Sequence, residues 1–144
     1  MRSKLLSDTG SEKSWVIVFD TDEEAMAGLL AFARDQHITA AHFTAIGAFS
    51  RAVVGYFDWQ SKQYLRTPID EQVEVVTLLG DIAQEGENPK VHAHAALAKR
   101  GGTMSGGHLL EGHVRPTLEV VVTASPKRLE RKFDQASGIA LIRT

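Results

Sequence analysis

The stretch EQVEVVTLLGDIAQEGENPKVHAHAALA, from Glu71 to Ala98, carries the pattern that decides the fold. Residues 71–83 and 90–98 are both rich in the residue types of β-strands, and turn-forming residues bound them. The segment between them, QEGENPK, contains Gly86 and Pro89, which favour a turn. A parallel pair of strands would need a crossover of a dozen or more residues. The stretch therefore predicts two strands joined by a turn, in a mainly antiparallel sheet.

The rest of the chain repeats this strand-and-turn pattern, with one clear exception. Further strand-like segments cover residues 14–20, 38–49, 51–59, 63–69, 106–114, 117–125 and 138–144. The exception is residues 20–37, where Thr21 and Glu24 have the spacing of a capping box at a helix N-terminus. A single helical stripe of apolar side chains follows, formed by Ala25, Met26, Leu29, Leu30 and Ala33.

These segments predict an α+β fold with a curved, mainly antiparallel β-sheet and one principal α-helix. Gly47, Gly55 and Gly80 lie in or beside strands, where they indicate bulges or bends. A short C-terminal helix is predicted in residues 124–137, with Ser125 as its N-cap and Pro126 at its first position. Residues 1–13 are predicted to be a polar N-terminal tail, and residues 14–144 a single domain.

Composition and charge limit the classes of function. The chain has 144 residues, and the absence of cysteine excludes disulfides and thiolate metal sites. Its formal net charge of −2 disfavours DNA binding, which usually needs a basic face. The one basic cluster, PKRLERK in residues 126–132, is diluted by Glu130. No apolar run approaches the roughly 18–20 residues that cross a bilayer, and the N-terminus lacks the apolar region of a signal peptide. A cytoplasmic protein without a membrane partner is expected.

The histidines are concentrated in one part of the chain. His92 and His94 are two residues apart, so in a strand both side chains project from the same face. His108 follows Gly106 and Gly107, which let two backbones approach closely, and it reaches the same face if the two segments pair as a hairpin. His113 lies five residues further on, so in a regular strand it faces the other side.

Three neutral imidazoles on one face predict a metal site with an open position for water. Such a centre polarises water or a carbonyl group, which permits hydrolytic or hydration chemistry without requiring it. Zinc is the expected ion because imidazole is one of its usual ligands, although iron, nickel and copper also bind imidazole. The sequence contains no P-loop, GxGxxG or GxSxG motif.

Four other polar residues lie in segments that could approach this site. His37 and His42 are interpreted as structural, because one follows the predicted helix and the other lies in an alternating strand. Glu74 is interpreted as a carboxylate on the sheet surface. Glu119 has the same interpretation, with the alternative that it supports a ligating imidazole from the outer shell.

The segments EVVTLLGDIA, KVHAHAAL, GGHLLEGHV and TLEVVV, in this order and spacing, resemble the plants-and-prokaryotes-conserved (PPC) domain. The resemblance spans about residues 14–141 and is closest to the standalone prokaryotic type. It implies a strongly curved sheet, a homotrimer and a metal site, usually suggested to hold zinc, at His92, His94 and His108. In the plant members DNA contact is attributed to a basic AT-hook, which this chain lacks.

Two hypotheses follow from the sequence. The first is a homotrimeric protein whose three-histidine metal site handles a small molecule, with or without catalysis. The second is a DNA-binding or transcription-associated interaction module, which rests on family analogy and on the basic cluster.

Overall fold

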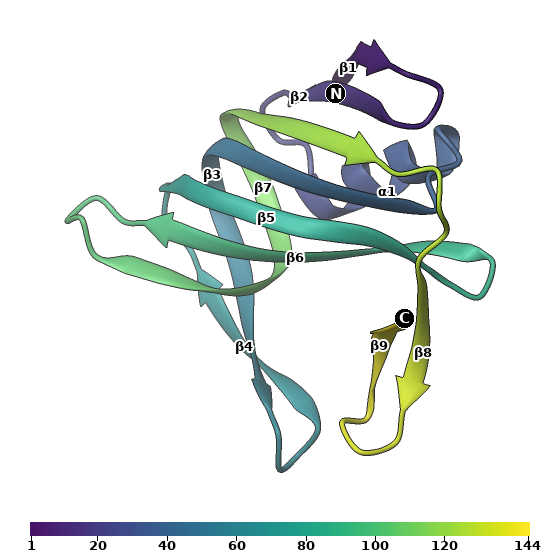
Figure 1. Ribbon diagram of the computed structural model, residues 1–144. Coiled ribbons are helices and arrows are strands. Elements are labelled where there is room, and N and C mark those ends of the chain that lie inside the picture. The colour runs from purple at the N-terminus through teal and green to yellow at the C-terminus, as the bar shows by residue number, and fades with distance from the viewer.

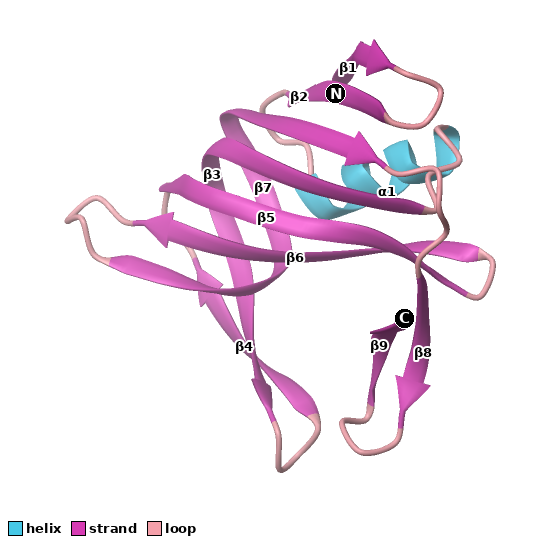
Figure 2. Ribbon diagram, viewed as in Figure 1, coloured by secondary structure: helices cyan, strands magenta, loops and turns pink.

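The computed structural model describes all residues 1–144 and contains nine strands and one helix (Figures 1 and 2). Their bounds, in chain order, are β1 Arg2–Asp8, β2 Lys13–Phe19, α1 Ala25–Asp35, β3 Ala40–Asp58, β4 Gln63–Ile69, β5 Val73–Glu85, β6 Asn88–Ala98, β7 Met104–Ala124, β8 Glu130–Asp134 and β9 Ile139–Arg143. The α+β class with one principal helix is confirmed.

All nine strands belong to one strongly curved sheet. Its order is β1-β2-β7-β3-β5-β8-β9, with β4 paired to β3 and with β6 paired to both β5 and β7. The pairs β7–β3, β3–β5, β5–β6 and β6–β7 are all antiparallel, so these four strands close a ring of ladders. This closure brings β6 and the start of β7 together, although β7 pairs with β3 along the rest of its length.

The turn predicted between the strand-like segments 71–83 and 90–98 is confirmed, and the two strands form a hairpin. Strands β5 and β6 pair from Glu74 opposite Ala98 to Glu85 opposite Asn88. The segments predicted as separate strands at 38–49 and 51–59 form the single strand β3, and those at 106–114 and 117–125 form β7. Both long strands remain continuous because bulges absorb the curvature, one of them between Ala45 and Gly47.

Helix α1 has a different N-cap from the one predicted. Glu24 caps the helix, and its carboxylate accepts hydrogen bonds from the backbone N–H groups of Met26 and Ala27 at 3.1 and 2.6 Å. Thr21 instead donates its hydroxyl to the carbonyl oxygen of Pro116. The backbone between them turns at Asp22, where φ is 70°, so the helix cannot begin earlier.

The predicted C-terminal helix is wrong. Residues 130–134 form strand β8, which pairs antiparallel with β9 from Glu130 opposite Arg143 to Asp134 opposite Ile139. Asp134 starts the connecting turn, because its side chain and its carbonyl accept hydrogen bonds from the N–H groups of Ser137 and Gly138. The sequence predicts the final strand but not its pairing with residues 130–134. This pairing therefore overrides the local helix signal.

The predicted N-terminal tail is also structured. Arg2–Asp8 forms the edge strand β1 and pairs with β2, although all seven of its side chains are exposed. Backbone pairing at a sheet edge needs no buried side chain. The polar sequence of this segment therefore does not indicate the strand.

The core lies between α1 and the sheet and continues into the ring of strands. It is a single cluster of 27 buried apolar residues that includes Leu29 and Phe32 of the helix and Phe43 and Phe49 of β3. The β3–β4 and β8–β9 hairpins both project away from α1 (Figure 1). The one helix, α1, is not long and apolar enough to span a bilayer.

Candidate metal centre

His92 and His94 lie on the outward face of β6, as their spacing predicts. The intervening Ala93 and the following Ala95 point the other way and are buried in the core. Because β6 is held on both sides, by β5 and by β7, the two imidazoles have a fixed place on the sheet.

His108 joins them through the β6–β7 pairing. It stands directly opposite His94 in the register, and the strands are joined by the turn that follows Ala98. The preceding glycines make this approach feasible: a Cβ on Gly106 would lie 2.6 Å from the carbonyl oxygen of Ala95, and one on Gly107 would lie 2.7 Å from that of Gly55. The predicted role of the double glycine is confirmed.

The three imidazoles form one compact group. The ring centroids of His92 and His108 are 5.0 Å apart, those of His92 and His94 are 5.1 Å apart, and those of His94 and His108 are 5.5 Å apart. One ring nitrogen from each lies within 4.8 Å of the others, so the group could hold a metal ion. The ring of Tyr64, from β4, packs at 4.5 Å against His108.

Asp81 and Arg131 support this group from behind His92. Asp81 is the cross-strand partner of His92, and its Oδ2 lies 3.4 Å from His92 Nδ1. Arg131 reaches in from β8 and donates to Asp81 Oδ1 at 2.6 Å, while its Nη2 lies 3.3 Å from the same His92 nitrogen. When His92 Nδ1 carries the proton and donates it to Asp81 Oδ2, Nε2 keeps its lone pair for a metal.

Sequence reasoning missed both supporting residues. Arg131 lies in the segment predicted as a helix, and its role depends on a parallel contact between β5 and β8 that no local pattern reveals. Asp81 could have been found, because it falls opposite His92 once the β5–β6 turn is placed at residues 86–87.

The environment favours the neutral form of two of the imidazoles, those of His94 and His108, and metal ligation requires that form. Burial, followed by the charges of His92 and His94, lowers the pKa of His108 to about 4. Burial and then the charge of His92 also lower the pKa of His94. Desolvation works to raise the pKa of Asp81, but its contacts with His92 and Arg131 outweigh this and hold the pKa below its ordinary value. Asp81 therefore stays ionised beside His92.

The residues present fit a metal ion. His108 Nδ1 is buried and has no hydrogen-bond partner, an arrangement that costs about 1–3 kcal/mol in a group left unsatisfied. A cation bound to the imidazoles is a natural partner for such a nitrogen. Three nitrogen donors and no competing carboxylate among them match the ligand preference of zinc and similar ions.

Comparison with known proteins agrees with this geometry. Residues 6–126 match the model of the Plants and Prokaryotes Conserved (PCC) domain. The chain belongs to this family. The resemblance inferred from the motif order is confirmed.

Two solved structures are similar to this PCC domain along nearly their whole length. A metal-containing protein from Archaeoglobus fulgidus is 32% identical with a TM-score of 0.85, covering 92% of this chain and 94% of its own. A candidate DNA-binding protein from Ralstonia eutropha JMP134 is 30% identical with a TM-score of 0.85, covering 90% of each chain.

A curated relative is much longer than this chain. The bifunctional protein GlmU of Synechococcus sp. (strain JA-3-3Ab) is 32% identical over 133 residues. The match takes in 90% of this chain but only 20% of that protein, so the chain corresponds to a small part of it.

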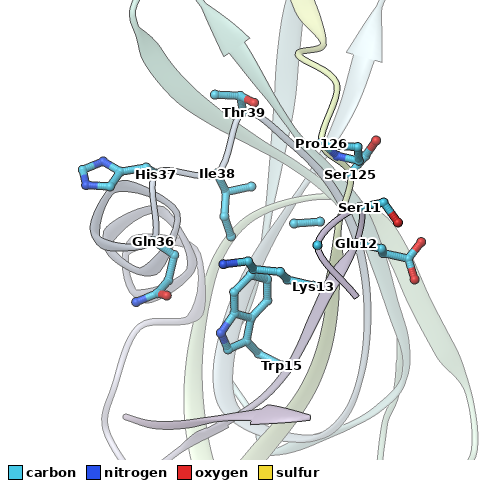
Figure 3. Close-up of a pocket in the computed structure, with 12 residues that line it drawn as sticks. Ser11, Glu12, Lys13, Trp15, Gln36, His37, Ile38, Thr39, Ser125 and Pro126 are labelled. Carbon is cyan, nitrogen blue, oxygen red and sulfur yellow. The ribbon is translucent and has the colours of Figure 1, made fainter. Parts of the chain in front are cut away.

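The other histidines of the PCC domain lie outside the group. His113 faces Arg51, and the Nη2 of Arg51 lies 3.3 Å from His113 Nε2. His42, on β3, is exposed and lies opposite Asp81 of β5. His37 follows α1 and borders a separate cavity of about 240 Å³ (Figure 3). That cavity is lined by Lys13 and Trp15 on one side and by residues 36–39 on the other, and none of the three imidazoles borders it.

The two glutamates do not support the histidines. Glu119 is exposed on β7 opposite Ile46, and no hydrogen bond or ion pair joins it to any histidine. The hypothesis of an outer-shell role for Glu119 is therefore wrong, and Asp81 takes that place. Glu74 is an exposed residue near the start of β5, in agreement with its interpretation as a surface carboxylate.

Proposed function

We propose that this chain is a metal-binding PCC-domain protein in which His92, His94 and His108 hold one divalent ion, zinc, for the handling of a small molecule. The observation that carries the proposal is the convergence of one nitrogen from each histidine within 4.8 Å. The likeness to the metal-containing archaeal protein, at 32% identity, supports it. Zinc is favoured because imidazole is among its preferred ligands.

The residues of the chain have distinct parts in this function. The three histidines supply neutral donors, Asp81 and Arg131 hold His92 in one orientation, and Tyr64 packs against His108. A zinc ion with three protein ligands keeps an open position, at which it polarises water or the carbonyl of a ligand. The function is therefore binding of a small polar molecule, or its hydrolysis.

The metal content of untagged protein tests this proposal. Titration of metal-stripped protein with zinc at neutral pH is expected to show one ion bound per chain, with release of that ion as the pH falls and the imidazoles are protonated. Competition among zinc, iron, nickel and cobalt in the same assay identifies the preferred ion. Protein that takes up no divalent ion would contradict the proposal.

We also propose that the chain assembles as a homotrimer, as the family resemblance implies. An apolar patch on the outward face of the sheet supports assembly: Ile46, Leu79 and Val121 are 61%, 52% and 44% exposed. Leu79 and Val121 are both cross-strand partners of Thr44, so they lie in one row of that face. Contiguous exposed apolar side chains of this kind mark interaction surfaces.

Sedimentation equilibrium tests the assembly. The wild-type protein is expected at three times the 15.7 kDa of one chain. Val121→Glu places a charge in the patch and is expected to shift the mass towards one chain, whereas Leu6→Glu, on a more exposed residue of the edge strand β1, leaves it unchanged. A wild-type mass of one chain would refute the trimer.

DNA binding has less support as the function. The arginines of the basic cluster are already paired, Arg128 with Glu87 and Glu130, and Arg131 with Asp81. Neutralised side chains contribute little to binding phosphates. The names of similar proteins, such as the Ralstonia protein, point towards DNA binding, but they concern those proteins.

A further inference from the structure

A cavity of about 470 Å³ lies between the β8–β9 hairpin and the histidine group. His92 and His108 form one end of it, and strands β4, β6, β7, β8 and β9 contribute to its walls. Its volume falls within the range of about 300–1,000 Å³ that is usual for small-molecule sites. The β8–β9 hairpin lies beyond residues 6–126 that match the family model, so this wall is not part of the matched region.

The walls away from the histidines are mostly apolar. Leu110 of β7 and Val91 of β6 line the floor, and Phe133, Ile139 and Leu141 line the side formed by the hairpin. Phe133 is 66% exposed, although an aromatic ring of this size is usually packed against other groups. The cavity therefore offers a surface for a small hydrocarbon chain that starts at the histidines.

The polar end of the cavity favours a negative head group. The charged side chains there are paired: Arg131, 9% exposed, with Asp81, and Lys90 with Glu85. These pairs leave no net charge, and an imidazole that binds a metal does so in its neutral form. No unpaired acidic side chain lines the cavity to balance the charge of a divalent ion held by the three imidazoles. Arg131 Nε is in addition a buried donor without a partner, so the surroundings are short of acceptors.

We propose that this cavity binds small monocarboxylates with an unbranched apolar chain, the carboxylate at the histidine group and the chain along the β8–β9 hairpin. The inference rests on the proposed function for its head-group part, because the uncompensated charge belongs to the bound ion. The apolar part rests on the cavity walls alone.

A chain-length series tests both parts. Acetate, butanoate and hexanoate are titrated calorimetrically into zinc-loaded protein, with hexylamine as a probe of the same length and opposite charge. A buried methylene adds roughly fourfold to affinity, and half-burial about twofold. Hexanoate is therefore expected to bind at least about tenfold more tightly than acetate, and hexylamine far more weakly than hexanoate.

Two variants locate the chain in the cavity. Phe133→Ala is expected to weaken hexanoate binding by about three- to tenfold while leaving acetate binding and zinc binding unchanged. Ile139→Ala should act in the same direction. Leu6→Ala, which removes an exposed apolar side chain of β1 outside the cavity, is the matched control and should change nothing.

Each outcome has one meaning. Equal binding of acetate and hexanoate, or hexanoate binding that Phe133→Ala does not affect, overturns the apolar site. Equal binding of hexylamine and hexanoate overturns the anionic head group. Failure to bind zinc would instead contradict the proposed function and the head-group part with it; the same series on metal-free protein then decides the apolar site alone.

Discussion

The variant His108→Ala is expected to lose nearly all of its affinity for zinc. Zinc sites in small peptides are worth about 10–16 kcal/mol for four ligands, which is about 3 kcal/mol per ligand. The loss of one of three ligands should therefore weaken binding by about a hundredfold or more. Calorimetric titration of metal-stripped protein measures this directly, and circular dichroism shows whether the variant is folded.

A graded series makes this prediction specific. Asp81→Asn keeps the shape of the residue that holds His92 but removes its charge, and it is expected to weaken zinc binding by about 10–100-fold. His113→Ala is the matched control, because His113 lies on the same strand as His108 but faces Arg51 instead of the group. An affinity lost equally in His108→Ala and His113→Ala would show that the three-histidine assignment is wrong.

The variant Gly80→Val is expected to prevent the sheet from forming around the metal centre. A Cβ at this position would lie 2.1 Å from the carbonyl oxygen of His92 and 2.6 Å from Cζ of Phe43. Gly80 pairs in regular register with Phe43 on one side and Ala93 on the other, so neither strand can move away alone. We expect destabilisation of at least about 3 kcal/mol, or a fall in Tm of about 10 °C.

Gly101→Ala is the control for this substitution. Its Cβ would meet nothing within 4 Å, and its φ is not in the left-handed region, so an effect within about 0.5 kcal/mol is expected. Thermal unfolding of the two variants beside wild type measures the difference. Wild-type stability in Gly80→Val would mean that β5 and β6 are not held at this distance.

At Gly80 the sequence pattern indicated the wrong reason for a glycine. The sequence indicated a bulge or bend at this glycine, but no register shift occurs there in either ladder. The glycine is needed because two neighbouring groups occupy the space of a side chain. A bulge and a close approach both favour glycine, so the residue type alone cannot distinguish them. At Gly47 the bulge was correctly predicted.

Much of the fold followed from local pattern. The turn at Gly86 and Pro89 joined two strands too closely for a crossover, and this required an antiparallel pair. Strand β4 was predicted with its observed bounds, Gln63–Ile69. The prediction of a C-terminal helix was wrong because strand β8 exists only through its pairing with β9. A short sequence with helix-forming residues does not reveal such a partner.

The sequence by itself determined the donors of the candidate metal centre. The period of a strand places His92 and His94 on one face whatever the rest of the chain does, and the double glycine before His108 permits the close pairing that brings it there. Only the tertiary structure decided what surrounds them. Asp81 and Arg131 reach His92 across ladders between segments 11 and 39 residues away, and the β8–β9 hairpin encloses the cavity beside it. Such contacts depend on how the sheet curves and closes, which no local period records.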